Sequence, residues 1–134
     1  MSYITIENIN SINAELTNYC NAACPMCARY FLDGKAQDKI INNAHTSLEF
    51  FAEKIPLTVI KRLERFRSCG NLGDGAMAPE SLQIFQYVRK HNRTVKLQLH
   101  SNGGLRSKEF WQELAKLNVH VTFAIDGLQD TNHL

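Results

Sequence analysis

The sequence lacks any apolar run long enough to span a membrane, because no stretch approaches roughly 18 consecutive apolar residues. Residues 1–10 carry neither a basic segment nor an apolar one, so no secretory signal is predicted. The sequence also lacks a marked excess of either charge, since it has 15 Lys and Arg against 13 Asp and Glu, which gives a formal net charge of +2. So small an excess gives no reason to expect nucleic-acid binding. We therefore expect a cytoplasmic chain whose partners include neither a membrane nor a nucleic acid.

Disulfides are not expected either, because a reducing compartment keeps thiols free. The chain nevertheless has four cysteines, and Cys20, Cys24 and Cys27 lie within one short segment. Cysteines in a reducing compartment are typically metal ligands or free thiols. The clustering therefore makes residues 20–27 a candidate metal site.

Strand and helix signals alternate along the chain from about residue 11 to its end. Strands are expected over residues 12–19, 68–71, 95–100 and 119–126, and helices are expected to begin near Thr46, Pro56, Pro79 and Ser107. Strands separated by helices with short links are typical of a parallel sheet with right-handed crossovers. We therefore predict an α/β fold in one domain, residues 1–134, with a loop and a short helix inserted over residues 28–55.

The third and fourth expected strands are apolar on one face only. Val95, Leu97 and Leu99 alternate with polar residues, and the same alternation runs through residues 119–126. A parallel strand that is covered on both faces is apolar on both. We therefore expect helices over the apolar face and a polar concavity on the other. That arrangement suits a parallel partial (β/α) barrel better than a closed barrel filled with branched side chains.

The three clustered cysteines follow the first expected strand directly, with the spacing C-x-x-x-C-x-x-C. Ligands in open α/β folds bind at this carboxyl end of the strands. Three thiolates can hold three corners of a cubane iron–sulfur cluster and leave the fourth iron open to a small molecule. Two alternatives stay open on spacing alone: a zinc site completed by Cys69, and plain free thiols.

The run Cys20-Asn21-Ala22-Ala23-Cys24-Pro25-Met26-Cys27 resembles the signature of the radical S-adenosylmethionine (radical SAM) superfamily. The resemblance extends to the approach residues 15–21, the glycine turn at 70–75, Ser-Asn-Gly at 101–103 and Asp-Gly at 126–127, and so covers roughly residues 12–130. Each motif falls at the end of an expected strand, and this shared placement carries more weight than any one motif. The resemblance implies a [4Fe–4S] cluster on Cys20, Cys24 and Cys27, with S-adenosylmethionine chelating the open iron.

In that superfamily the reduced cluster passes one electron to the sulfonium, and the carbon–sulfur bond breaks to give methionine and a 5′-deoxyadenosyl radical. The radical then abstracts hydrogen from the substrate, while the protein supplies ligation, orientation and exclusion of water. The resemblance thus implies an enzyme whose partners are S-adenosylmethionine, an electron donor such as flavodoxin or ferredoxin, and a substrate. The general likeness is to the peptide-modifying branch, which favours a peptide substrate.

The resemblance also implies cofactor-binding residues at the strand ends. Met26 precedes the third cysteine, where the family often has an aromatic residue near the adenine, and its sulfur can still pack on a ring. The turn at 70–74 corresponds to the glycine-rich turn that receives the methionine ammonium, although it departs from the common Gly-Gly-Glu form. The complete set of implied contacts is Met26, Gly70, Asn71, Gly73, Asp74, Ser101, Asn102 and Asp126. For all of these except Met26, an ordinary turn is the alternative explanation.

The family core has six strand–helix units, and about four are expected in this chain. We therefore expect the core to be incomplete at its C-terminus. A homo-oligomer or a second chain would complete it, since an exposed sheet edge favours pairing. An incomplete core keeps a non-catalytic iron–sulfur fragment open as a further alternative to the enzyme and the zinc module.

Overall fold

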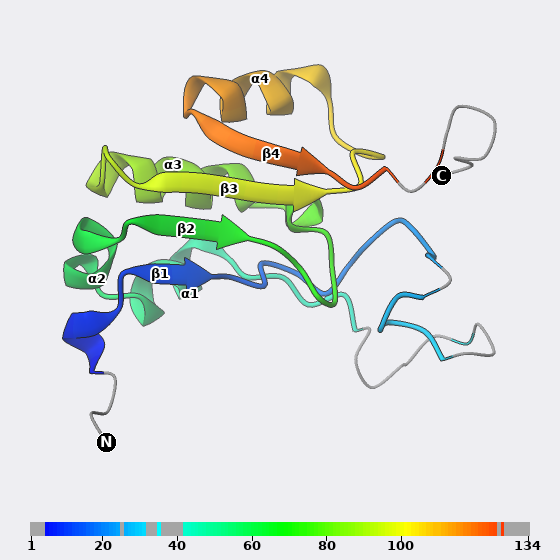
Figure 1. Cartoon of the computed structure of the whole chain (residues 1–134), viewed down its shortest axis with the longest axis horizontal. Helices are drawn as coiled ribbons and strands as arrows, with labels where there is room; N and C mark the ends of the chain where they lie inside the picture. The colour runs from blue at the N-terminus through cyan, green and yellow to red at the C-terminus, as the bar shows by residue number, and fades with distance from the viewer. Residues whose placement is uncertain (1–4, 25, 32–34, 36–41, 126, 128–134) are drawn as a thin grey trace.

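The computed structural model describes residues 5–24, 26–31, 35, 42–125 and 127. Its centre is a parallel sheet with the strand order β1-β2-β3-β4, so that neighbours in the sequence are neighbours in the sheet (Figure 1). The strands are β1 Ser11–Asn13, β2 Arg65–Ser68, β3 Lys96–Ser101 and β4 Val119–Phe123. The predicted α/β class with a parallel sheet is confirmed. β1 and β4 form the two edges of this sheet.

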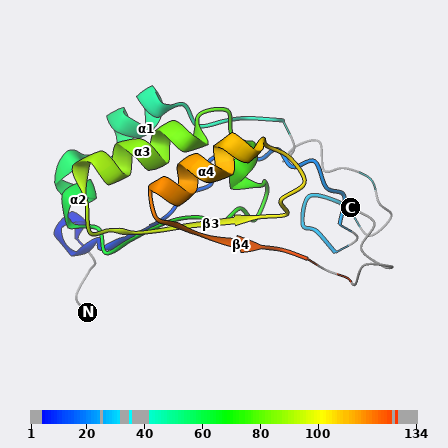
Figure 2. The same cartoon turned by 90° about the horizontal axis from the view of Figure 1, so that it is seen from above.

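Four α-helices are present in the described part of the chain: α1 Leu48–Lys54, α2 Leu57–Arg62, α3 Ser81–His91 and α4 Lys108–Lys116. Two short 3-10 turns, η1 Ile6–Asn8 and η2 Gly75–Met77, precede β1 and α3. All four helices lie on the same face of the sheet (Figure 2). None of these described helices combines the length and the apolar character needed to cross a membrane.

The alternation along β3 explains why the helices cover one face. Leu97 and Leu99 are buried in the core beneath the helices, whereas Lys96, the first residue of the strand, is exposed and Gln98 is half-buried. On β2, the buried Phe66 packs edge-on against Phe51 of α1, with ring centroids 5.6 Å apart. The opposite face of the sheet presents the polar side chains and carries no described helix, as predicted from the sequence.

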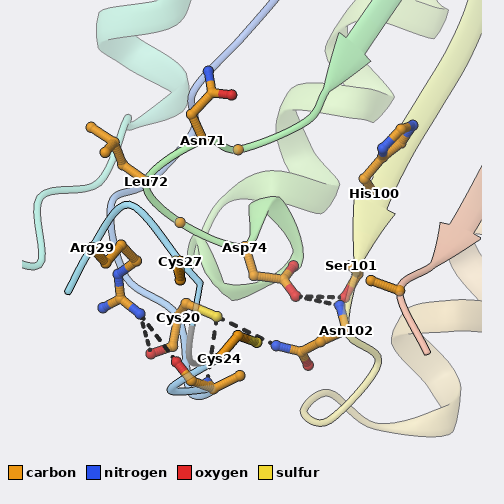
Figure 3. Close-up of a pocket in the computed structure, with 14 residues that line it drawn as sticks. Cys20, Cys24, Cys27, Arg29, Asn71, Leu72, Asp74, His100, Ser101 and Asn102 are labelled. Atoms are coloured by element: carbon orange, nitrogen blue, oxygen red, sulfur yellow. Dashed lines mark hydrogen bonds between the residues drawn. The ribbon is translucent and has the colours of Figure 1, made fainter. Parts of the chain in front are cut away.

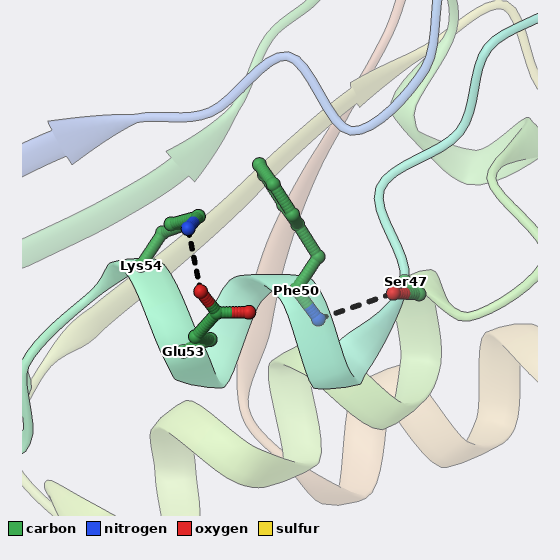
Figure 4. Close-up of polar contacts among 4 residues, drawn as sticks. All are labelled: Ser47, Phe50, Glu53 and Lys54. Carbon is green, nitrogen blue, oxygen red and sulfur yellow. Dashed lines mark hydrogen bonds and ion pairs between the residues drawn. The ribbon is translucent and has the colours of Figure 1, made fainter.

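Two helices begin close to their predicted positions because a serine caps each of them. The Ser47 hydroxyl accepts a hydrogen bond from the Phe50 backbone N–H at 3.1 Å, so α1 starts one residue after Ser47 and not at Thr46 (Figure 4). Ser107 caps α4 in the same way through the N–H of Phe110. Local hydrogen-bonding chemistry therefore fixes these helix starts.

Two predicted strands are wrong in extent. The first strand ends at Asn13 because residues 14–19 leave the sheet, where Thr17 forms an antiparallel bridge to His45. The second strand lies three residues earlier than predicted, because Phe66 is a core residue in register with Leu97. Both shifts place the segments that follow β1 and β2 outside the sheet and beside each other, where Asp74 N donates to Tyr19 O at 2.9 Å.

A buried asparagine, Asn92, ties the end of α2 to the start of β3. Its Nδ2 donates to the carbonyl oxygens of Ile60 and Leu63 at 2.9 and 2.8 Å, and its Oδ1 accepts from Val95 N at 3.0 Å. The last carbonyls of a helix have no partner within the helix. Asn92 therefore gives hydrogen-bond partners to backbone groups at the end of α2 and at the start of β3, in addition to the Leu63 N–H that Ile60 O already accepts.

We expect Asn92→Ala to lower the free energy of unfolding by about 2–4 kcal/mol, because Leu63 O and Val95 N lose this buried hydrogen-bond partner at once. Urea denaturation followed by circular dichroism measures this change. The control is Gln83→Ala on the exposed face of α3, which should shift stability by no more than about 0.5 kcal/mol. Equal losses in the two variants would contradict this role for Asn92.

Candidate metal and cofactor site

A cavity of about 200 Å³ opens at the carboxyl end of the sheet (Figure 3). Three segments meet there: the loop that carries Cys20, Cys24 and Cys27, which we call the cysteine loop, the turn after β2, and the chain after β3. Its wall consists of Cys20, Ala22, Cys24, Cys27, Arg29, Gly70, Asn71, Leu72, Gly73, Asp74, His100, Ser101, Asn102 and Ala124. Every residue that the sequence predicts for the site lies in this wall, apart from Met26 and Asp126. Met26 is 88% exposed and does not line the cavity. Asp126 lies outside the described residues.

The cysteine loop is held by its own backbone and by one arginine. Cys27 N donates to Cys24 O at 3.0 Å, which makes a tight turn between these two ligand candidates. Arg29 Nη1 donates to the carbonyl oxygens of Cys20 and Ala22 at 3.2 and 3.3 Å (Figure 3). Arg29 therefore clamps the first half of the loop. The sequence interpretation missed Arg29, whose one signal is its place two residues after the last cysteine.

Arg29 is buried, and its Nε has no hydrogen-bond partner among the described residues. The ion pairs of the described residues do not include it. The partners of this buried guanidinium among the described residues are neutral: two carbonyl oxygens and the ring of Tyr30. A buried charge is costly unless it is paired, so an anionic group held by the loop would offset it. A cluster ligated by thiolates is such a group, and the orphaned Nε therefore fits the prediction for the cysteines.

The three cysteines are chemically suited to bind a metal, but their sulfur atoms are not arranged around a common point. Cys20, Cys24 and Cys27 are half-buried cysteines outside any disulfide and lie in one wall, and thiolates are the ligands that iron–sulfur clusters and zinc prefer. No group of three or more His, Cys, Asp or Glu is arranged to hold a metal ion in the part of the chain that the structure describes. The loop would therefore have to close around a bound cluster, as expected where binding and local folding are coupled.

The carboxylate of Asp74 is buried and already accepts three hydrogen bonds. Its Oδ1 accepts from Ala76 N at 2.9 Å, which caps η2, and its Oδ2 accepts from Ser101 Oγ at 2.9 Å and Asn102 N at 2.8 Å (Figure 3). Asp74 thus joins the turn after β2 to the end of β3. That Asp74 and Ser101 contact a cofactor stays a prediction, but both side chains have a structural role in this wall.

Asn102 lies directly against the first cysteine. Its Nδ2 donates to Cys20 Sγ at 3.4 Å (Figure 3). The same Nδ2 donates to Asn21 Oδ1 at 2.9 Å, and its Oδ1 accepts from Gly104 N at 2.7 Å. The side-chain amide is therefore fixed at both ends. The implied contact of Asn102 with the cofactor stays a prediction, and its contacts in the structure include the thiol of Cys20.

The turn after β2 requires glycine at two positions. A Cβ on Gly70 would lie 1.7 Å from Gly73 O, and a Cβ on Gly73 would lie 2.2 Å from Thr17 O. Both distances are far inside van der Waals contact with backbone atoms. Gly70 therefore allows the turn to close on itself, and Gly73 allows the turn to press against the segment that leads into the cysteine loop. Asn71, between them, is held by its backbone N–H, which donates to Glu15 Oε1.

Cys69, the candidate fourth zinc ligand, is in contact with a histidine. Its Sγ lies 3.3 Å from His100 Nδ1, and Cys69 is not among the residues that line the cavity. His100 itself is part of the wall. A zinc ion shared by all four cysteines would therefore require Cys69 to leave this histidine.

Comparison of the chain with family models, with curated proteins and with solved structures finds no match. The fold and the site define the chain as an α/β protein with a thiol-lined cavity at the carboxyl end of a parallel sheet.

Proposed function

We propose that the chain is a radical SAM enzyme, or the cofactor-binding part of one. The observation that supports this most is the composition of one cavity wall. Three cysteines with the spacing C-x-x-x-C-x-x-C share it with the glycine turn after β2 and the polar pair after β3. Parallel α/β folds bind their ligands at this end of the sheet. In this proposal the polar face without helices is the inner wall of a partial (β/α) barrel.

Cys20, Cys24 and Cys27 would hold a [4Fe–4S] cluster, with the fourth iron open to S-adenosylmethionine. When bound and reduced by an electron donor, the cluster would supply the electron that cleaves S-adenosylmethionine to methionine and a 5′-deoxyadenosyl radical. The cytoplasm, as a reducing compartment, would keep these three thiols reduced and available for the cluster.

The other residues of the wall would orient the ligands. Arg29 shapes the cysteine loop through two carbonyl oxygens, and Asp74 fixes the backbone of Asn102, whose amide then reaches Cys20. Ligand-orienting partners of this kind tune a metal site as well as holding it in place. Asn102 is therefore a positioning residue that acts through Cys20.

We expect Asn102→Leu to lower the reduction potential of the reconstituted cluster by roughly 40 mV. The amide dipole stabilises negative charge on the sulfur, and this charge grows on reduction, so a hydrogen bond worth about 1 kcal/mol favours the reduced state. Electron paramagnetic resonance during a redox titration measures the potential. Leu105→Ala, an exposed change in the same loop, serves as the control. An unchanged potential in Asn102→Leu would refute the tuning role.

Anaerobic reconstitution with iron and sulfide tests the proposed function itself. The optical spectrum and the electron paramagnetic resonance of the reduced protein are recorded with and without S-adenosylmethionine. We expect a broad charge-transfer band and a reduced-cluster signal that changes when S-adenosylmethionine is added, because the open iron then gains ligands. A cluster indifferent to S-adenosylmethionine would identify a non-catalytic iron–sulfur fragment. One tightly held zinc and no cluster would identify the zinc module.

A further inference from the structure

The sheet face that carries no described helix is basic. The described outward positions of its strands are Ser11, Asn13, Arg65, Arg67, Lys96, Gln98, His100, His120 and Thr122, which alternate with the buried or helix-facing residues. None of these described positions holds Asp or Glu. We refer to Arg65, Arg67, Lys96, His100 and His120 as the basic strip.

The charges of the basic strip are not neutralised within the described residues. The ion pairs Lys54–Glu53 and Lys116–Glu113 lie on helices and involve no member of the strip. Arg67 Nε donates to the neutral Gln98 Oε1 at 3.2 Å. The whole chain has a formal net charge of only +2, so the strip is a local excess and not a general basic character.

The pairing of two strands brings like charges together. Arg65 on β2 is in register with Lys96 on β3, so two cations stand directly opposite each other across the sheet. Like charges in opposite positions destabilise a sheet. An anionic ligand bound on this face would offset the repulsion between Arg65 and Lys96. Binding of such a ligand would therefore explain why two cations stand opposite each other here.

The strip leads to the thiol-lined cavity. His100 belongs to the cavity wall, and Lys96 lies four residues earlier on the same face of β3. At about 3.3 Å per residue the strip extends roughly 13 Å from the cavity, which is the length of about four residues of an extended peptide. A ligand lying on the strip would thus place one of its ends at the cavity.

We propose that the basic strip binds an acidic peptide segment and guides it to the cavity. As a statement about substrate class, this rests on the proposed radical SAM function. Guanidinium groups pair with carboxylates through two parallel hydrogen bonds, and Arg65 and Arg67 provide two of them. Sheets that bind single-stranded nucleic acids stack the bases on aromatic side chains. The outward positions described for β2 and β3 hold no Phe, Tyr or Trp, the large aromatic side chains on which bases stack best, which favours a peptide.

Fluorescence anisotropy with the full chain, without cluster and at low salt, tests this site. The probes are a fluorescein-labelled peptide with four consecutive glutamates, its counterpart with four glutamines, and a single-stranded oligonucleotide of equal charge. The double variant Arg65→Gln/Lys96→Gln removes two cations of the strip. Its control, Lys90→Gln/Lys108→Gln, removes two exposed cations from α3 and α4 on the other face.

We expect the glutamate peptide to bind more tightly than either other probe, and the strip variant to bind it about tenfold more weakly while the control is unchanged. Equal binding of the glutamate and glutamine peptides, or an equal loss in the control variant, would overturn the site. Tighter binding of the oligonucleotide would overturn the peptide assignment. Because these measurements need no cluster, a failed reconstitution would refute the proposed enzyme and leave the peptide result standing. Absence of peptide binding in a chain that assembles a cluster would refute the strip alone.

Discussion

Serine in place of any one of Cys20, Cys24 and Cys27 is expected to reduce the iron and sulfide bound after anaerobic reconstitution to background. A cubane cluster with three protein ligands has no spare thiolate, and a serine hydroxyl is a poor substitute for a soft sulfur ligand. The three thiols lie in one wall, whereas Cys69 does not line the cavity and contacts His100. Iron and sulfide analysis and the charge-transfer absorbance measure the effect.

The matched control is Cys69→Ser, which removes the fourth thiol and should leave the cluster content unchanged. This control separates a cluster with three ligands from a zinc site with four. Loss of metal in all four variants, with zinc as the metal bound by the wild type, would contradict the iron–sulfur assignment. Retention of the cluster in Cys24→Ser would contradict the proposed ligand set.

Gly73→Ala is expected to lower the free energy of unfolding by about 3 kcal/mol or more, because the new methyl group would enter occupied space that cannot relax cheaply. Its Cβ would lie 2.2 Å from Thr17 O and 2.8 Å from Tyr19 O, and both are backbone atoms. The Asp74 N to Tyr19 O hydrogen bond next to this contact holds the two segments together. Thermal and urea denaturation measure the loss.

Gly104→Ala is the control for this prediction. The atoms nearest to a Cβ on Gly104 belong to side chains and not to the backbone: Asn21 Nδ2 at 2.9 Å and Asn102 Oδ1 at 3.0 Å. Side chains yield by a few tenths of an ångström more cheaply than backbone. We therefore expect this variant to lose less than about 1 kcal/mol. If the Gly73→Ala protein were as stable as the Gly104→Ala protein, the turn would not be packed against the segment that leads into the cysteine loop as described.

The positions of the site residues along the chain could be predicted from the sequence, but their contacts could not. Cys20, Gly73 and Asn102 each follow a strand, and strands that run in parallel end at the same edge of a sheet. Nothing local indicates that the Asn102 amide reaches the Cys20 sulfur or that the carboxylate of Asp74 is used within the protein. The residues in these contacts lie 82 and 28 positions apart in the chain.

Local patterns in the sequence determined the class of fold, the one-sided cover of the sheet and the serine-capped helix starts. The alternation of apolar and polar residues indicates which side chains are buried, and a capping serine indicates where a helix begins. Both signals lie within a few residues of the sequence. The tertiary structure decided where β1 ends, where β2 begins and which cations stand opposite each other. Those features depend on the register of β2 against β3 and on the pairing of Thr17 with His45. Such pairings join distant segments through burial and backbone hydrogen bonds, for which no short stretch of sequence carries the signal.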